Sequence, residues 1–101
     1  MYLLRMYVTG HTEKTADTIE HVLRMLRDTL DILEDEQALE IIDIMEAPQR
    51  ALEDKVFATP TLVKVSPLPS RRIIGDLSDN QKVREALELV IREGILGTGQ
   101  A

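Results

Sequence analysis

The feature that most constrains the fold is a strand-like segment, a long helical repeat and a second strand-like segment in immediate succession. Residues 2–8 are β-branched, aromatic or long apolar side chains and predict a strand, whose one face would carry Tyr2, Leu4, Met6 and Val8. Residues 38–45 are rich in isoleucine and predict a second strand. A strand–helix–strand order predicts two parallel strands joined by a right-handed crossover.

The helical repeat covers residues 12–34 and is the clearest helix in the sequence. Thr12 is a suitable N-cap, because its hydroxyl can accept a hydrogen bond from a free main-chain N–H of the first turn. Apolar side chains recur at intervals of three and four residues, which indicates one buried stripe. The predicted stripe consists of Ala16, Ile19, Leu23, Leu26, Leu30 and Leu33.

The second half of the chain predicts a helix, two strands and a last helix. Pro48 suits the first turn of a short helix over residues 48–56. The span Ser66–Ser70 is short enough for a hairpin between strands at 62–65 and 71–74. For the last helix, over 79–93, we expect Ser78 as the N-cap, Gln81 completing a capping box, and a stripe of Val83, Leu87 and Val90.

This βαβαββα order resembles the thioredoxin-like plan, a mixed four-stranded sheet with helices on both faces. We expect one domain over residues 1–101, with 95–101 as a loose tail. Thioredoxin-like enzymes place a cysteine after the first strand, but this chain has no cysteine, so thiol redox catalysis is excluded. By the same plan, Pro60 is expected to follow a cis peptide bond.

Composition excludes several classes of function. The net charge of −6 and an aromatic content of 3% argue against binding to nucleic acid. No apolar run approaches the length of a membrane span, so no membrane contact and a cytoplasmic location are expected. His11 and His21 are ten residues apart with no third ligand at a suitable spacing, so no metal is expected. The chain has no Walker or dinucleotide-binding glycine motif, and no other cofactor is expected. Asp43 interrupts an isoleucine run and is expected at a strand edge or end.

Charge is segregated along the chain. Residues 28–54 contain ten acidic side chains and one basic side chain, whereas residues 55–84 contain six basic and two acidic ones. One interpretation is two solvated faces. The other is a polarised molecule that attracts a partner of complementary potential.

One stretch of the sequence is distinctive as a motif. The series Glu53–Val65, Pro67–Pro69 and Arg71–Asp79 resembles the KaiB family of circadian clock proteins. The opening Tyr2–Gly10 fits the same family, and the middle of the chain does so in the same order through Ile42-Asp43-Ile44 and Ala47-Pro48-Gln49. The resemblance covers nearly the whole chain.

The resemblance implies a non-enzymatic adaptor that binds and modulates a hexameric KaiC-type ATPase in a circadian clock, or in a timing or stress system. Such an adaptor can compete with the input domain of a sensor histidine kinase. The alternative is a stand-alone thioredoxin-like sensor domain related to clock histidine kinases. Carried onto this chain, the partner-binding residues are Lys55, Val56, Phe57, Lys64, Arg71, Arg72 and Asp76.

The family also implies fold switching between a thioredoxin-like monomer and a ground state whose C-terminal half is rearranged, with self-association to a dimer or tetramer. Ala86 stands where cyanobacterial members commonly carry glycine, and alanine favours a helix interior by about 1 kcal/mol. Ala86, Glu88 and the cis-proline candidate Pro60 are therefore the residues expected to influence the switch, in favour of the thioredoxin-like form.

Two charge reversals set this chain apart from the cyanobacterial clock members. Glu40 stands where those members usually carry lysine, and Asp17 stands where they usually carry arginine. Both reversals argue against KaiA-type contacts. They indicate a divergent or non-cyanobacterial member that works with a KaiC-type partner alone.

Overall fold

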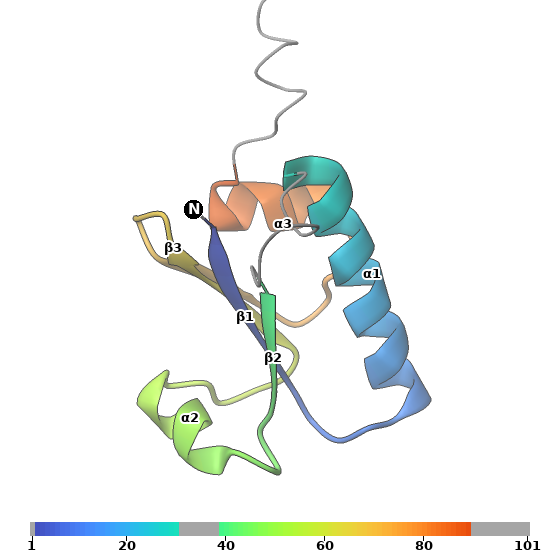
Figure 1. The fold of residues 1–101 in the computed structure, drawn as a ribbon, viewed down its shortest axis with the longest axis vertical. Coiled ribbons are helices and arrows are strands. Elements are labelled where there is room, and N and C mark those ends of the chain that lie inside the picture. The colour runs from blue at the N-terminus through green and yellow to red at the C-terminus, as the bar shows by residue number, and fades with distance from the viewer. Residues whose placement is uncertain (1, 31–38, 90–101) are drawn as a thin grey trace, which may run out of the picture.

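The computed structural model describes residues 2–30 and 39–89, and it has the predicted thioredoxin-like plan (Figure 1). Four strands form one sheet in the order β2-β1-β3-β4. β1 is parallel to β2 and antiparallel to β3, and β4 is antiparallel to β3. The strands are β1 Leu3–Val8, β2 Leu39–Asp43, β3 Thr61–Ser66 and β4 Arg71–Ile74, and the helices are α1 Glu13–Leu30, α2 Pro48–Glu53 and α3 Asn80–Leu87.

The two faces of the sheet have separate apolar cores. Alternation along β1 sends Leu4, Met6 and Val8 to one face, where they pack with buried residues of α1 and α3. Tyr7 points to the other face and packs with Ile42, Ala51, Val56 and Val63, beneath α2. Helices therefore cover both faces of the sheet, as the sequence predicts.

The first helix begins as predicted but buries a different stripe. The Thr12 hydroxyl accepts a hydrogen bond from the Thr15 N–H at 3.1 Å, which confirms the N-cap. Ala16 is exposed and Leu23 is half-buried, so the predicted stripe is wrong at these positions. The side chains of Leu30 and Leu33 lie outside the described residues. Leu26 of the predicted stripe is buried as expected, together with Val22 and Met25, which the stripe did not include.

The two later helices end earlier than their periodicity suggests. α2 stops at Glu53 rather than at residue 56, and α3 stops at Leu87 rather than at residue 93. Glu88 adopts a left-handed conformation, with φ of 55°, so α3 cannot continue through it. Asp79, not Ser78, is the N-cap of α3, because its side chain accepts the Lys82 N–H at 3.2 Å. The expected capping box is therefore wrong.

The peptide bond between Thr59 and Pro60 is cis, as expected. The Ser66–Pro67 and Leu68–Pro69 bonds are also cis, which the sequence did not indicate. The expected loose tail, 95–101, and Val90 of the α3 stripe lie outside the described residues. Among the described helices, none has the length and apolar character that a membrane span needs.

Candidate partner-binding surface

The central feature of the predicted binding stretch is a tight turn that ends α2. Lys55 has a φ of 57° and an exposed side chain, and its N–H bonds the Leu52 carbonyl at 3.1 Å. The Val56 N–H then bonds the Ala51 carbonyl at 2.8 Å. This pair of hydrogen bonds is the Schellman motif, which satisfies carbonyls at the end of a helix. It fixes the direction in which the chain leaves α2.

Arg72 of β4 braces this turn from a distant part of the chain. Its guanidinium donates to the Asp54 carbonyl at 2.7 Å and to the Lys55 carbonyl at 3.2 Å. A planar guanidinium can make both bonds at once, which a lysine ammonium cannot do in the same geometry. Arg72 therefore positions Lys55 in addition to contributing its own charge to the surface.

Val56 and Phe57 are neighbours with opposite environments. Val56 is 7% exposed and packs in the core beneath α2. Phe57 is 84% exposed, the most exposed of the large apolar side chains in the described part of the chain. Only Phe57 of this pair can contact a partner in this conformation, while Val56 holds the segment to the sheet.

A polar network beneath α2 holds the same turn to β1. The Asp54 carboxylate accepts hydrogen bonds from the Tyr7 hydroxyl and from the Arg5 guanidinium, the latter at 3.1 Å. Burial raises the pKa of Tyr7 to about 12, and the hydrogen bond to Asp54 adds to this effect. Burial works against the ionised form of Asp54, but the bonds from Tyr7 and Arg5 outweigh it and leave the Asp54 pKa lowered.

Glu40, one of the two charge reversals, is bound within the molecule. Arg50 of α2 donates two hydrogen bonds to the Glu40 carboxylate, at 2.7 and 2.9 Å. This bidentate pair lowers the pKa of Glu40 and joins α2 to the edge strand β2. Sequence reasoning did not identify the residues that anchor α2, although Arg5 and Tyr7 share the strand face opposite the predicted apolar one.

Arg71 and Arg72 lie on opposite faces of the sheet. Arg72 lies opposite Val63, on the face covered by α2, whereas Arg71 lies opposite Lys64, on the face covered by α3. The Arg71 guanidinium donates to the Glu88 carboxylate at 2.9 Å. The two arginines, adjacent in sequence, therefore do not form one basic patch.

Lys64 is not available as a surface contact in this fold. Its side chain is 1% exposed, and its ammonium lies 3.5 Å from the Glu88 carbonyl oxygen. The prediction that Lys64 touches a partner is corrected accordingly: the side chain shares the sheet face of Leu4 and interacts with the end of α3. Sequence reasoning could not assign this, because lysine is rarely buried.

Asp76 and Pro60 belong to a separate groove between α1 and the segment that precedes α3. The groove is also lined by Asp17, the second charge reversal, and by His21. Asp76 accepts a hydrogen bond from the Ser78 N–H at 2.9 Å, and its bonds with Ser78 lower its pKa. Ala86 is half-buried against the core of α1 and α3. The predicted partner-binding residues are thus divided among three places, which are the end of α2, the end of α3 and this groove.

Comparison with known proteins assigns the chain to a family. The model of the KaiB domain matches residues 5–89. A Prochlorococcus marinus protein named circadian clock oscillator protein KaiB is 44% identical, over 98% of this chain and 83% of that protein. A Synechococcus elongatus protein of the same name is 46% identical, over 91% of this chain and 87% of that protein. The names of these relatives describe a clock protein and no catalytic activity.

Solved structures agree on the fold. The N-terminal domain of Synechococcus elongatus SasA has a TM-score of 0.65 and 22% identity, covering 86% of this chain and 83% of that one. Thioredoxin 1 of Thermosipho africanus has a TM-score of 0.63 and 15% identity, covering 97% and 98%. At these identities the likeness supports the thioredoxin-like fold alone. On the family match and on relatives of about 45% identity along most of its length, the chain belongs to the KaiB family.

Proposed function

We propose that this protein is a non-enzymatic adaptor of a circadian clock or related timing system, which binds and modulates a hexameric KaiC-type ATPase. Its curated relatives are named circadian clock oscillator proteins, which supports the clock role. The absence of cysteine removes the thiol chemistry that thioredoxin-like enzymes use. We therefore assign the protein a role in binding rather than in catalysis.

The observation that carries the proposal is the exposure of Phe57 next to Lys55 on a turn that is held rigid. Aromatic side chains bury a large area at low entropic cost and often dominate the energy of an interface. Arg72 and the Schellman hydrogen bonds fix the main chain at Lys55, so little order has to be gained on binding. We name Phe57, Lys55 and Arg72 the α2-end surface.

The proposed partner surface has an apolar pocket for Phe57 and an acidic rim for Lys55. The α2-end surface is positive, whereas the whole chain has a net charge of −6. A partner is therefore attracted preferentially with its acidic surface facing the end of α2. Arg71 and Asp76 lie at other places on the molecule, and we assign them a secondary part. Val56 supports the surface from within, whereas Lys64 is buried on the other face of the sheet. Neither residue has a direct contact in the proposal.

Co-elution with a hexameric KaiC-type ATPase, with and without ATP, tests the proposal. The matched variants are Phe57→Ala and Leu68→Ala, because these two side chains are 84% and 81% exposed but lie at different places. Removing either costs little folding stability, since neither is buried. We expect Phe57→Ala to abolish co-elution and Leu68→Ala to preserve it. Equal behaviour of the two variants, or no co-elution of the wild type, would contradict the proposal.

The second candidate function is that of a stand-alone sensor domain related to clock histidine kinases. The fold likeness to the SasA N-terminal domain favours it, but the identity of 22% is half that to the KaiB relatives. Competition decides between the two. An adaptor displaces a kinase input domain from the ATPase, whereas under the second proposal the chain binds a histidine kinase and leaves that domain on the ATPase. Light scattering of the free protein measures the proposed dimer or tetramer.

A further inference from the structure

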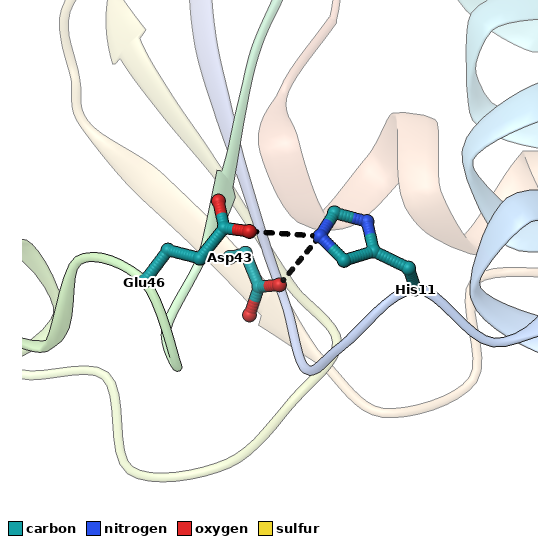
Figure 2. Close-up of side chains that lie close together, drawn as sticks. All are labelled: His11, Asp43 and Glu46. Carbon is teal, nitrogen blue, oxygen red and sulfur yellow. Dashed lines mark hydrogen bonds and ion pairs between the residues drawn. The ribbon is translucent and has the colours of Figure 1, made fainter.

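Three metal-ligating side chains meet at the end of the sheet where β1 and β2 finish. Because the two strands are parallel, the loops that follow them lie side by side. His11 lies in the loop after β1, Asp43 is the last residue of β2, and Glu46 lies in the next turn. Figure 2 shows the His11 ring directed at both carboxylates. Its Nε2 atom is 3.3 Å from Asp43 Oδ2 and 2.9 Å from Glu46 Oε2.

Asp43 is held in place independently of His11. Its side chain is 7% exposed, and its Oδ1 atom accepts the Gly10 N–H at 3.1 Å and the Met45 N–H at 2.9 Å. These two bonds leave Oδ2 directed at His11. Carboxylates that bind metals are commonly oriented by hydrogen bonds to their other oxygen. The arrangement therefore has one fixed oxygen ligand, together with two ligands on exposed side chains.

Charge balance distinguishes a cation site from a simple ion pair. The Nε2 atom carries at most one hydrogen, yet two carboxylate oxygens lie within reach of it. A protonated His11 neutralises one of the two carboxylates and leaves a net negative charge. A divalent cation bound by neutral imidazole and both carboxylates gives a net charge of zero.

The distances between the ligand atoms also suit a metal ion. Two ligands that are each about 2.1 Å from one ion, at an angle of about 90–109°, lie about 3.0–3.4 Å apart. The separations of 2.9 and 3.3 Å from Nε2 are close to this range. All three ligand atoms lie within 4.8 Å of one another. Only small side-chain adjustments would be needed.

We propose that His11, Asp43 and Glu46 bind one divalent transition-metal ion of the zinc type. One imidazole nitrogen and two carboxylate oxygens suit zinc or its first-row neighbours, whereas magnesium and calcium favour sites made wholly of oxygen. The ion has three protein ligands, and water or a ligand from another molecule completes its coordination. His11 is 77% exposed, so an ion reaches the site from solvent without opening the fold.

Bound zinc would cross-link the loop after β1 to the turn after β2, two segments that no disulfide joins because the chain has no cysteine. Because the ion binds the folded chain, it raises the free energy of unfolding as its concentration rises. The site is separate from the α2-end surface, and the inference does not depend on the proposed clock function. Its failure would leave the adaptor proposal intact.

The test is a calorimetric titration of the full chain with zinc ion alone, in a buffer that does not chelate metals. We expect one ion per chain, and a loss of affinity of at least about tenfold in His11→Ala and in Glu46→Gln. His21→Ala is the matched control, because His21 bonds Asn80 away from the site, and its affinity stays unchanged. In nuclear magnetic resonance spectra, zinc shifts the ring signals of His11 and leaves those of His21 in place.

Three results would overturn the inference. They are no saturable binding to the wild type, unchanged affinity in His11→Ala, or several ions per chain that respond equally to both histidine variants. The last result means an adventitious ion only. Circular dichroism checks that each variant keeps its fold. If His11→Ala unfolds, Glu46→Gln, which changes an exposed side chain without altering its size, decides the outcome.

Discussion

Lys55 and Glu88 occupy equivalent positions in two copies of the same helix-ending motif. Each has a left-handed main chain, with φ of 57° and 55°, and each is followed by a buried residue, Val56 or Leu89. The Leu89 N–H bonds the Arg84 carbonyl at 2.9 Å, as the Val56 N–H bonds that of Ala51. Glycine is the usual residue at this position, because a side chain there costs roughly 1–2 kcal/mol.

Glu88→Gly is therefore expected to stabilise the fold, by about 1 kcal/mol, because it removes the strain of the left-handed conformation. The ion pair lost with Arg71 is about half exposed on both sides and contributes little. The Glu88 carbonyl that Lys64 contacts remains. The measurement is the free energy of unfolding in urea.

Ala86→Gly is expected to do the opposite and to destabilise the fold by about 1 kcal/mol, because Ala86 lies inside α3. It serves as the control for Glu88→Gly in the same helix. If both glycine variants shift the urea midpoint in the same direction, the assignment of the helix end at Leu87 is wrong. Chemical shifts of Ala86 and Glu88 locate that end directly.

Lys55→Gly separates binding from stability. It removes the proposed contact charge and also the backbone strain, so we expect weaker binding to the KaiC-type ATPase together with a higher melting temperature. Lys55→Glu should weaken binding further, because it reverses the charge. Lys82→Glu is the control for charge, since Lys82 is exposed on α3. Undiminished affinity in Lys55→Glu would contradict the α2-end surface.

Arg72→Lys keeps the charge but loses the paired bonds to the Asp54 and Lys55 carbonyls. Each bond is worth about 1 kcal/mol, so we expect faster amide hydrogen exchange at Val56 and reduced affinity for the partner. Arg72→Glu adds an electrostatic loss that high salt partly removes. Equal exchange rates in Arg72→Lys and the wild type would show that the turn does not need the brace.

Tyr7 should give the protein a characteristic response to alkaline pH. Burial, with the Asp54 hydrogen bond, raises its pKa to about 12 from an ordinary value of about 10. Because the folded-state pKa is raised, the resulting stability is complete below pH about 10 and is lost as pH rises towards about 12. Tyr7→Phe should flatten this part of the stability profile. Asp54→Asn should lower the midpoint at which the Tyr7 hydroxyl ionises, measured by absorbance.

Local pattern in the sequence was sufficient for the order of elements and for the family. The alternation in residues 2–8 and the proline-rich turn at 67–70 specify strands and a hairpin with few alternatives. The absence of cysteine excluded thiol chemistry without reference to any structure. These properties depend on residues that are close together along the chain, so they can be recognised from the sequence alone.

Only the tertiary structure decided where helices end and which charges are exposed. Helical periodicity continues past Lys55 and Glu88, and neither residue is glycine. The burial of Val56 and Leu89 therefore outweighs the local preference for a longer helix. Lys64 became buried, and Arg71 and Arg72 were separated, because the pleat of a strand sends successive side chains to opposite faces. His11 met Asp43 and Glu46 because β1 and β2 are parallel, a contact between residues more than thirty positions apart that local spacing does not encode.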